Sequence, residues 1–358
     1  MKRQLLGVAA ILLSISTYAQ DNPLWMRYCA ISPDGTTIAF TYKGDIYTVP
    51  STGGRASQIT TNPAHDTKPI WSPDGKKIAF ASDRMGSMDI FEVNKEGGIP
   101  KRLTTHSGNE TPVAYKDAGH ILFLANIMPT AEDAQFPSGQ FQQVYEVNTE
   151  GGRPILFSSM PMEDISINHT GNTLLYHDKK GYEDPWRKHH TSSITRDIWL
   201  CSLNGNRTFR KQTAFNGEDR TPVWASDDKS FYYLSEEKGS FNIFKRDIDG
   251  NTSKQITNHT KHPVRFLSAA SNGTLCYGYD GEIYTVKEGA IPQKVQISIV
   301  TDKNDKDLIR QIKRSGATEI SLSPDAKEIA FVLRGDVYVT STEYSTTKQI
   351  TNLSLIHI

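Results

Sequence analysis

A short motif recurs along the chain and constrains its fold more than any other feature. Ser72-Pro73-Asp74-Gly75 precedes the apolar run Ile78-Ala79-Phe80-Ala81, and Asp89-Ile90-Phe91 follows shortly after. Proline presets φ at the second position of a turn, and glycine supports the positive φ that reverses the chain. The motif therefore predicts a tight turn between two strands, the second of which is apolar on both faces.

Two markers of this unit recur seven times in the same order. The first is the turn with its apolar run, and its copies, some of which keep only the position, begin at Ser32, Ser72, Ala118, Thr170, Asp227, Asn272 and Ser323. The second is a polar residue, then Ile or Val, then an aromatic residue, and it begins at Asp45, Asp89, Gln143, Asp197, Asn242, Glu282 and Asp336. The chain is therefore built from repeats of one module.

Each module is interpreted as four short strands. In the second module these are the approach to Trp71 and residues 77–82, 89–94 and 100–104. Four strands every ~40 to 45 residues are typical of a β-propeller blade. A single blade cannot bury its two apolar faces alone, so closure into a ring supplies the core. We predict an all-β fold.

The predicted organisation is a six-bladed β-propeller of four-stranded antiparallel blades over residues 20–300. A charged linker at 301–315 and the first blade of a second propeller at 316–352 follow. A single seven-bladed ring is the alternative. Residues 353–358 continue no repeat pattern and are interpreted as an artefactual or disordered tail, with a natural apolar tail as the alternative.

The N-terminus has the pattern of a secretory signal. Lys2 and Arg3 precede an apolar run that ends near Leu13, and the small residue Ala19 suits signal peptidase. The run is about half the ~20 residues that a membrane span requires. We therefore predict a cleaved signal peptide at 1–19, an exported and periplasmic protein, and no membrane span in the mature form.

Composition and motifs exclude several classes of function. Lys plus Arg number 40 and Asp plus Glu number 40, so no overall field favours nucleic acid. Cys29, Cys201 and Cys276 lie in apolar runs and are predicted to be buried small hydrophobic residues, not a disulfide or metal framework. Gly-x-Ser-x-Gly, His-Glu-x-x-His, Cys-x-x-Cys and phosphate-binding glycine motifs are absent from the sequence. We predict no catalytic residue, no cofactor and no metal site.

Two modules carry insertions between their second and third strands, at residues 127–142 and 179–196. The second insertion combines acidic, aromatic and imidazole groups in Asp184, Trp186, His189 and His190. Because loops on a rigid scaffold often carry binding residues, we identify these four as a candidate peptide-binding loop. An ordinary long loop packed by its tryptophan remains the alternative.

The repeat resembles that of a known group of proteins. Ser72-Pro73-Asp74-Gly75 with Ile78 to Phe80, and the later Asp89-Ile90-Phe91, is similar to the PD40 or WD40-like repeat of TolB, prolyl-oligopeptidase-type enzymes and tricorn-like peptidases. The six modules and charged link are followed by residues 316–325 and 331–338, which are similar to the opening blade of a second propeller. This arrangement most resembles the tricorn-like group of S41 serine peptidases, over nearly everything after the signal.

The resemblance implies a function for the chain. Tricorn-like peptidases carry their catalytic groups in domains after both propellers, around a PDZ module, and no residue here matches that catalytic motif. The chain is then expected to be a non-catalytic propeller region that filters or channels peptides or unfolded polypeptide to catalytic domains missing from it. The alternatives are a TolB-like periplasmic protein-binding propeller without activity and a prolyl-oligopeptidase-type enzyme with a downstream hydrolase domain.

Overall fold

The computed structural model describes residues 23–127, 141–181, 184, 186, 194–300, 314–333 and 335–351. The predicted signal peptide, most of the predicted linker and the tail at 353–358 lie outside these residues. The chain divides into two compact units, residues 1–301 and 302–358. Within the described ranges no helix is long and apolar enough to cross a membrane.

The first unit contains six four-stranded sheets, and every pairing within them is antiparallel. In chain order the strands are β1 (Arg27–Ile31), β2 (Thr37–Tyr42), β3 (Asp45–Pro50) and β5 (Ser57–Gln58); β6 (Asp66–Trp71), β7 (Lys77–Ser82), β8 (Asp89–Asn94) and β9 (Lys101–Arg102); β10 (Glu110–Asp117), β11 (His120–Ala125), β12 (Gln143–Asn148) and β13 (Ile155–Ser158); β14 (Met162–Ile167), β15 (Thr173–Asp178), β16 (Ile198–Ser202) and β17 (Thr208–Lys211); β18 (Asp219–Trp224), β19 (Ser230–Ser235), β20 (Asn242–Asp247) and β21 (Ser253–Gln255); β22 (Arg265–Ala269), β23 (Leu275–Tyr279), β24 (Glu282–Val286) and β25 (Gln293–Lys294).

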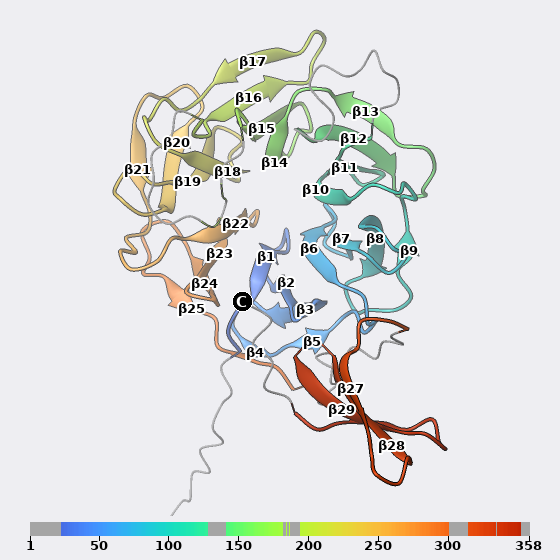
Figure 1. The fold of residues 1–358 in the computed structure, drawn as a ribbon. Coiled ribbons are helices and arrows are strands. Elements are labelled where there is room, and N and C mark those ends of the chain that lie inside the picture. The colour runs from blue at the N-terminus through green and yellow to red at the C-terminus, as the bar shows by residue number, and fades with distance from the viewer. Residues whose placement is uncertain are drawn as a thin grey trace, which may run out of the picture. The chain divides into compact units, whose positions relative to one another are not determined.

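The six sheets are the blades of a closed ring. Figure 1 shows the first strand of each sheet, β1, β6, β10, β14, β18 and β22, nearest the centre. Each of these strands contacts the first strand of the next blade, and β22 contacts β1. The ring therefore closes after six blades, and the prediction of an all-β propeller with four-stranded antiparallel blades is confirmed.

Local hydrogen bonds explain which residues recur in the turn. Ser72 Oγ donates to Asp74 Oδ1 at 2.7 Å, and the Lys77 amide donates to Ser72 Oγ at 2.9 Å. Gly75 adopts a φ of 67° and its amide donates to the Ser72 carbonyl at 2.9 Å. The predicted tight turn between two strands is thus confirmed.

The second marker is tied to the threonine at the end of the fourth strand. Thr257 Oγ1 accepts from the Ile243 amide at 2.9 Å and donates to Asn242 Oδ1 at 3.0 Å. The same threonine-to-amide bond is made in other blades by Thr60, Thr104, Thr213 and Thr351. Strands three and four are therefore joined by a buried side-chain hydroxyl in addition to their backbone ladder.

Replacing this hydroxyl by a methyl group tests its contribution. Thr257→Val keeps the side-chain shape but leaves the Ile243 amide without its acceptor in a site where Thr257 is only 2% exposed. We expect a loss of about 1 to 3 kcal/mol in the free energy of unfolding, measured by urea denaturation. Thr208→Val, at an exposed position of β17, is the matched control, and equal effects of the two changes would contradict this assignment.

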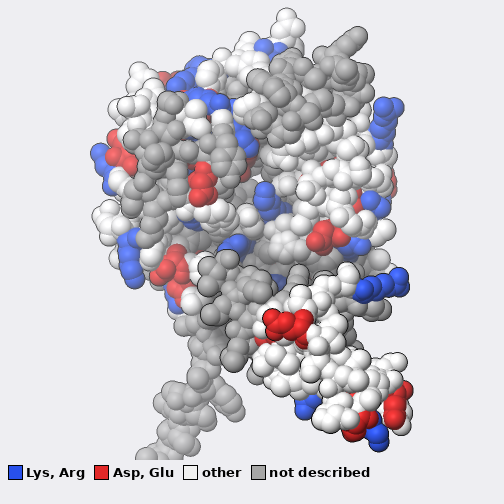
Figure 2. Space-filling view, in the orientation of Figure 1, with Lys and Arg blue, Asp and Glu red and all other residues white. Residues whose placement is uncertain are grey.

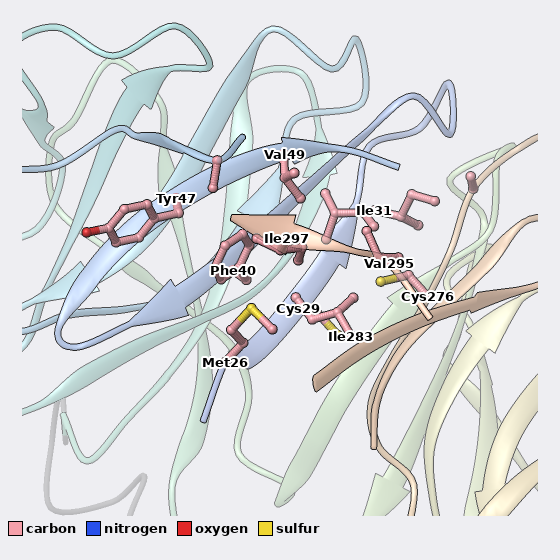
Figure 3. Close-up of a cluster of buried hydrophobic side chains, with 13 residues drawn as sticks. Met26, Cys29, Ile31, Phe40, Tyr47, Val49, Cys276, Ile283, Val295 and Ile297 are labelled. Carbon is pink, nitrogen blue, oxygen red and sulfur yellow. The ribbon is translucent and has the colours of Figure 1, made fainter. Parts of the chain in front are cut away.

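A shared core fastens the first blade to the sixth. Figure 3 shows Met26, Cys29 and Phe40 of the first blade packed with Cys276 and Ile283 of the sixth. All three cysteines are buried and free, as predicted from their apolar surroundings.

A pair of short parallel strands completes this junction. β26 (Ile297–Ser298) follows the sixth blade and pairs with β4 (Gly54–Arg55) of the first. The approach is close, because a Cβ on Gly53 would lie 2.6 Å from the Gln296 carbonyl oxygen. Glycine at position 53 is therefore required for this backbone contact.

The second unit contains one further four-stranded antiparallel sheet, whose strands are β27 (Thr318–Leu322), β28 (Glu328–Leu333), β29 (Asp336–Ser341) and β30 (Thr347–Gln349). Its turn repeats the pattern of the first unit, with Ser323 Oγ donating to Asp325 Oδ1 at 2.6 Å. Several of its large apolar side chains are more than half exposed, including Ile320, Leu322 and Ile350. One sheet does not bury its own apolar residues.

Candidate functional site

The innermost strands share a backbone irregularity that places one side chain from each of five blades at the axis. β1, β6, β14, β18 and β22 each contain a register shift. At each shift a residue other than glycine has a φ of 48° to 57°, and these residues are Tyr28, Lys68, Asp164, Thr221 and Phe266. Such a φ is uncommon outside glycine, so its repetition at one position marks a shared feature of the blades. We call these five residues the axial ring.

The third blade is the exception, and its sequence explains why. Pro112 of β10 occupies the corresponding position. The proline ring fixes φ near −65°, so this residue cannot adopt the left-handed conformation. The register of β10 shifts instead between Pro112 and Ala114.

Charges of opposite sign occur on different blades of the axial ring. Burial lowers the pKa of Lys68 on β6, and the charges of Asp164 and Glu163 on β14 partly oppose this shift. Burial raises the pKa of Tyr28 on β1, with Arg27 lowering it and Asp164 raising it. The field of Asp164, on the fourth blade, therefore reaches side chains of the first and second.

The two acidic residues of the fourth blade, Asp164 and Glu163, each have hydrogen-bond partners near the axis. Asp164 Oδ2 accepts from Thr221 Oγ1 at 2.7 Å, and Glu163 Oε1 accepts from Lys179 Nζ at 2.7 Å. His177 Nε2 lies 3.3 Å from Glu163 Oε2. Burial alone would raise the pKa of Glu163, but His177 and Lys179 hold it well below its usual range.

Solvent reaches the axial ring. The Asp164 side chain is 49% exposed although it lies on an innermost strand. Tyr28, Lys68, Thr221 and Phe266 also keep partial exposure. The ring therefore presents a cation, a carboxylate, a hydroxyl and two aromatic groups to molecules that reach the axis.

Two of the four predicted site residues lie within the described part of the chain. Asp184 Oδ1 accepts from the Trp186 amide at 2.8 Å. The Trp186 ring lies 6.1 Å from the Phe266 ring and 5.0 Å from the guanidinium carbon of Arg27. The Trp186 carbonyl also accepts from Arg265 Nη2 at 2.9 Å. His189 and His190 lie outside the described residues, so the predicted grouping of all four stays a prediction.

These contacts place Trp186 of the second insertion across the axis from its own blade. The insertion leaves the fourth blade between β15 and β16, whereas Trp186 contacts β1 of the first blade and β22 of the sixth. In a six-bladed ring the fourth blade lies opposite the first. Trp186 therefore lies beside Phe266 of the axial ring and beside Arg27 and Arg265, which directly precede ring residues.

The axial ring was not predicted from the sequence. Each member stands four residues before the residue whose amide closes the turn, and these closing residues are Ser32, Ser72, Asn168, Ala225 and Ala270. Aligning the approach strands on the turn would have shown one polar or aromatic column there.

Elsewhere on the visible face of the described residues, Figure 2 shows acidic and basic side chains interspersed. Within the described ranges no group of three or more His, Cys, Asp or Glu side chains could hold a metal ion.

Comparison with known proteins agrees with this architecture. The Tricorn protease homolog 1 of Streptomyces coelicolor is 25% identical over 281 residues, which cover 77% of this chain and 25% of that protein. The Tricorn protease of Thermoplasma acidophilum is 25% identical over 328 residues, covering 88% of this chain and 29% of that protein. The crystal structure of the tricorn protease aligns with a TM-score of 0.68 and 20% identity over 92% of this chain and 31% of that one, which shows the shared fold.

The chain spans about a quarter of the length of these curated relatives. A family model, the Tricorn protease N-terminal beta propeller domain, matches residues 23–290. This range holds all six blades except the last strand of the sixth, β25. The chain therefore belongs to the family of the Tricorn protease N-terminal beta propeller domain.

Proposed function

We propose that this chain is the propeller region of an exported tricorn-like serine peptidase, and that its axis filters or conducts peptides to catalytic domains outside the chain. The axial ring is the observation that carries the proposal. It combines hydrogen-bonding groups, charges and aromatic rings at a solvent-accessible axis, which suits an extended polypeptide better than a small apolar ligand.

The filter is steric. An extended peptide is a few ångströms wide and exposes its backbone amides and carbonyls, whereas a folded domain is much wider than a single strand spacing. Thr221 and Tyr28 can exchange hydrogen bonds with a passing backbone because hydroxyl groups both donate and accept. The ring would therefore admit unfolded chains and exclude folded ones.

The aromatic cluster beside the ring supports the same function. Trp186 and Phe266 present flat apolar surfaces near Arg27 and Arg265. Burial lowers the pKa of Arg265, an effect that the charges of Asp184 and Glu218 oppose. Aromatic groups beside fixed charges can hold many different side chains without selecting one, as a conduit for mixed peptides requires.

A cysteine at the axis tests the proposal. In Thr221→Cys we expect rapid alkylation by N-ethylmaleimide and by a maleimide on an unstructured 20-residue peptide, and little alkylation by a maleimide on a folded domain. The natural cysteines are buried and give a low background. Thr208→Cys, exposed on the outer strand β17, is the control and should react with all three reagents. Failure of the peptide reagent at Thr221→Cys, or equal reaction with the folded domain, would refute the proposal.

A further inference from the structure

We propose that Lys68 of the axial ring binds the side-chain carboxylates of peptides at the axis, so that the ring favours acidic sequences. This inference rests on the proposed function and names the class of peptide that the ring prefers. Lys68 lies on β6, and its Nζ lies 5.7 Å from the centre of the Tyr28 ring.

Lys68 differs from the paired cations near the axis in having no polar partner among the described residues. It forms no hydrogen bond or ion pair with them, and its ammonium approaches the aromatic ring of Tyr28. By contrast, Lys179 is paired with Glu163, and Arg196 Nη1 lies 2.8 Å from Glu218 Oε1. A cation that burial has partly desolvated gains more from a carboxylate than an exposed one does.

The acids of the fourth blade do not supply this partner. Asp164 and Glu163 influence the pKa of Lys68, but neither carboxylate lies within 4.0 Å of its Nζ. Asp164 is bonded to Thr221, and Glu163 is bonded to Lys179 and His177. Both carboxylates therefore have partners on their own side of the ring, which leaves the ammonium of Lys68 open to a ligand.

The residues next to the axial ring reinforce the preference. The position immediately before each ring residue holds a cation in three blades and an acid in one, and its occupants are Arg27, Thr67, Thr111, Glu163, Arg220 and Arg265. Some of these cations are already paired, as Arg220 Nη1 lies 3.6 Å from Glu218 Oε1. Among the described residues Arg27 has no carboxylate partner, and its positive charge raises the local concentration of anionic groups near the axis.

A side-chain carboxylate fits this geometry better than a chain terminus. An extended peptide advances about 3.3 Å per residue, so a chain moving along the axis presents successive side chains to one fixed point. Lysine is a compact charge on a flexible stem and does not require the fixed fork geometry that arginine imposes. Lys68 can therefore contact a Glu or Asp side chain in any sequence context.

Two peptides that differ by one charge test the inference. Binding of acetyl-Ala-Ala-Glu-Ala-Ala-amide and of the matching Gln peptide to the purified full chain is measured by isothermal titration calorimetry. We expect the Glu peptide to bind about tenfold more tightly, because a hydrogen bond to a charged group is stronger than one between neutral groups. In Lys68→Gln the ratio should fall to about one, and Lys68→Arg should retain most of the preference.

The controls separate this inference from the proposed function. Lys101→Gln, on the outer strand β9, should leave the ratio unchanged. Equal binding of the two peptides to the wild type, or a preference that persists in Lys68→Gln, would overturn the role of Lys68 while peptide binding itself stands. If neither peptide binds, the inference fails, and the alkylation of Thr221→Cys then shows whether the proposed function fails with it. The thermal unfolding of each variant confirms that it is folded.

Discussion

Arg84→Ala is expected to lower the free energy of unfolding by about 3 to 5 kcal/mol. Both carboxylate oxygens of Asp66 accept from Arg84 Nη2 at 2.9 Å, and the Asp66 side chain is fully buried. The Arg84 guanidinium also lies over the rings of Phe80 and Phe91, at 5.4 and 4.6 Å. Removing it leaves a buried carboxylate without its cation and exposes two rings. Urea denaturation measures the loss.

An exposed ion pair of similar length is the control for this change. Arg210 Nη1 lies 2.9 Å from Asp249 Oδ1, but the two side chains are 51% and 89% exposed. Exposed pairs contribute about 0 to 1 kcal/mol, so Arg210→Ala should have little effect. If the two substitutions cost the same, burial is not what makes the Arg84 pair important.

Glu110 should make the protein less stable as the pH rises from about 4.5 to 7. Burial raises the pKa of Glu110 to about 7, and Asp89 adds to this, while the hydrogen bond from Thr104 and the charge of Arg102 act in the opposite direction. Because the folded pKa lies above the unfolded one, the stabilisation is fully present below about pH 4.5 and is lost as the pH passes through about 7. A shift of this size corresponds to about 3 kcal/mol.

Glu110→Gln removes this titration. The variant should match the wild type near pH 4 and exceed it by up to about 3 kcal/mol at pH 8, where the wild type carries a buried charge. Unfolding by urea at a series of pH values gives both curves. Glu150→Gln changes a residue whose side chain is 84% exposed and should leave the wild-type curve nearly unaltered. A Glu110→Gln curve parallel to that of the wild type would disprove the assignment.

The two predictions concern the same position in different blades. Asp66, Glu110 and Asp219 each begin the innermost strand of their blade, and all three are buried. Asp66 has the cation Arg84 as its partner, whereas burial raises the pKa of Asp219 to about 7, as it does for Glu110. The three blades thus share a buried acid at this position. In one blade the acid is paired with a cation, and in the other two burial favours its neutral form.

The blades were predictable because their defining contacts are local. The hydrogen bonds from Ser72 to Asp74 and from Lys77 to Ser72 join residues at most five positions apart, so the pattern is legible in the sequence. The location of both insertions between second and third strands was also predicted correctly. The bond between the threonine that follows the fourth strand and the second marker was not predicted.

The axial ring depends on contacts that the sequence does not show. The positive φ belongs to the blade itself, because Glu319 in the single sheet of the second unit has a φ of 51° at the equivalent register shift. What the sequence does not show is that the innermost strands carrying Lys68 and Asp164 meet neighbours from other blades. Their mutual influence crosses from the second blade to the fourth. Likewise, the contact between Trp186 and Arg27 joins residues of opposite blades. Hydrophobic periodicity carries no information about such pairs. Pro112 could have been identified from the sequence as the exception among the blades, because proline cannot adopt a positive φ.

The parallel pair of β26 with β4 limits how a polypeptide could reach the axis. Ser298 and Gly54 are 244 residues apart in sequence, and their contact joins the end of the ring to its beginning. The first and sixth blades cannot be pulled apart sideways without rupturing that backbone pairing together with the core behind it. A peptide conducted as proposed would then have to enter and leave along the axis, and not between these two blades.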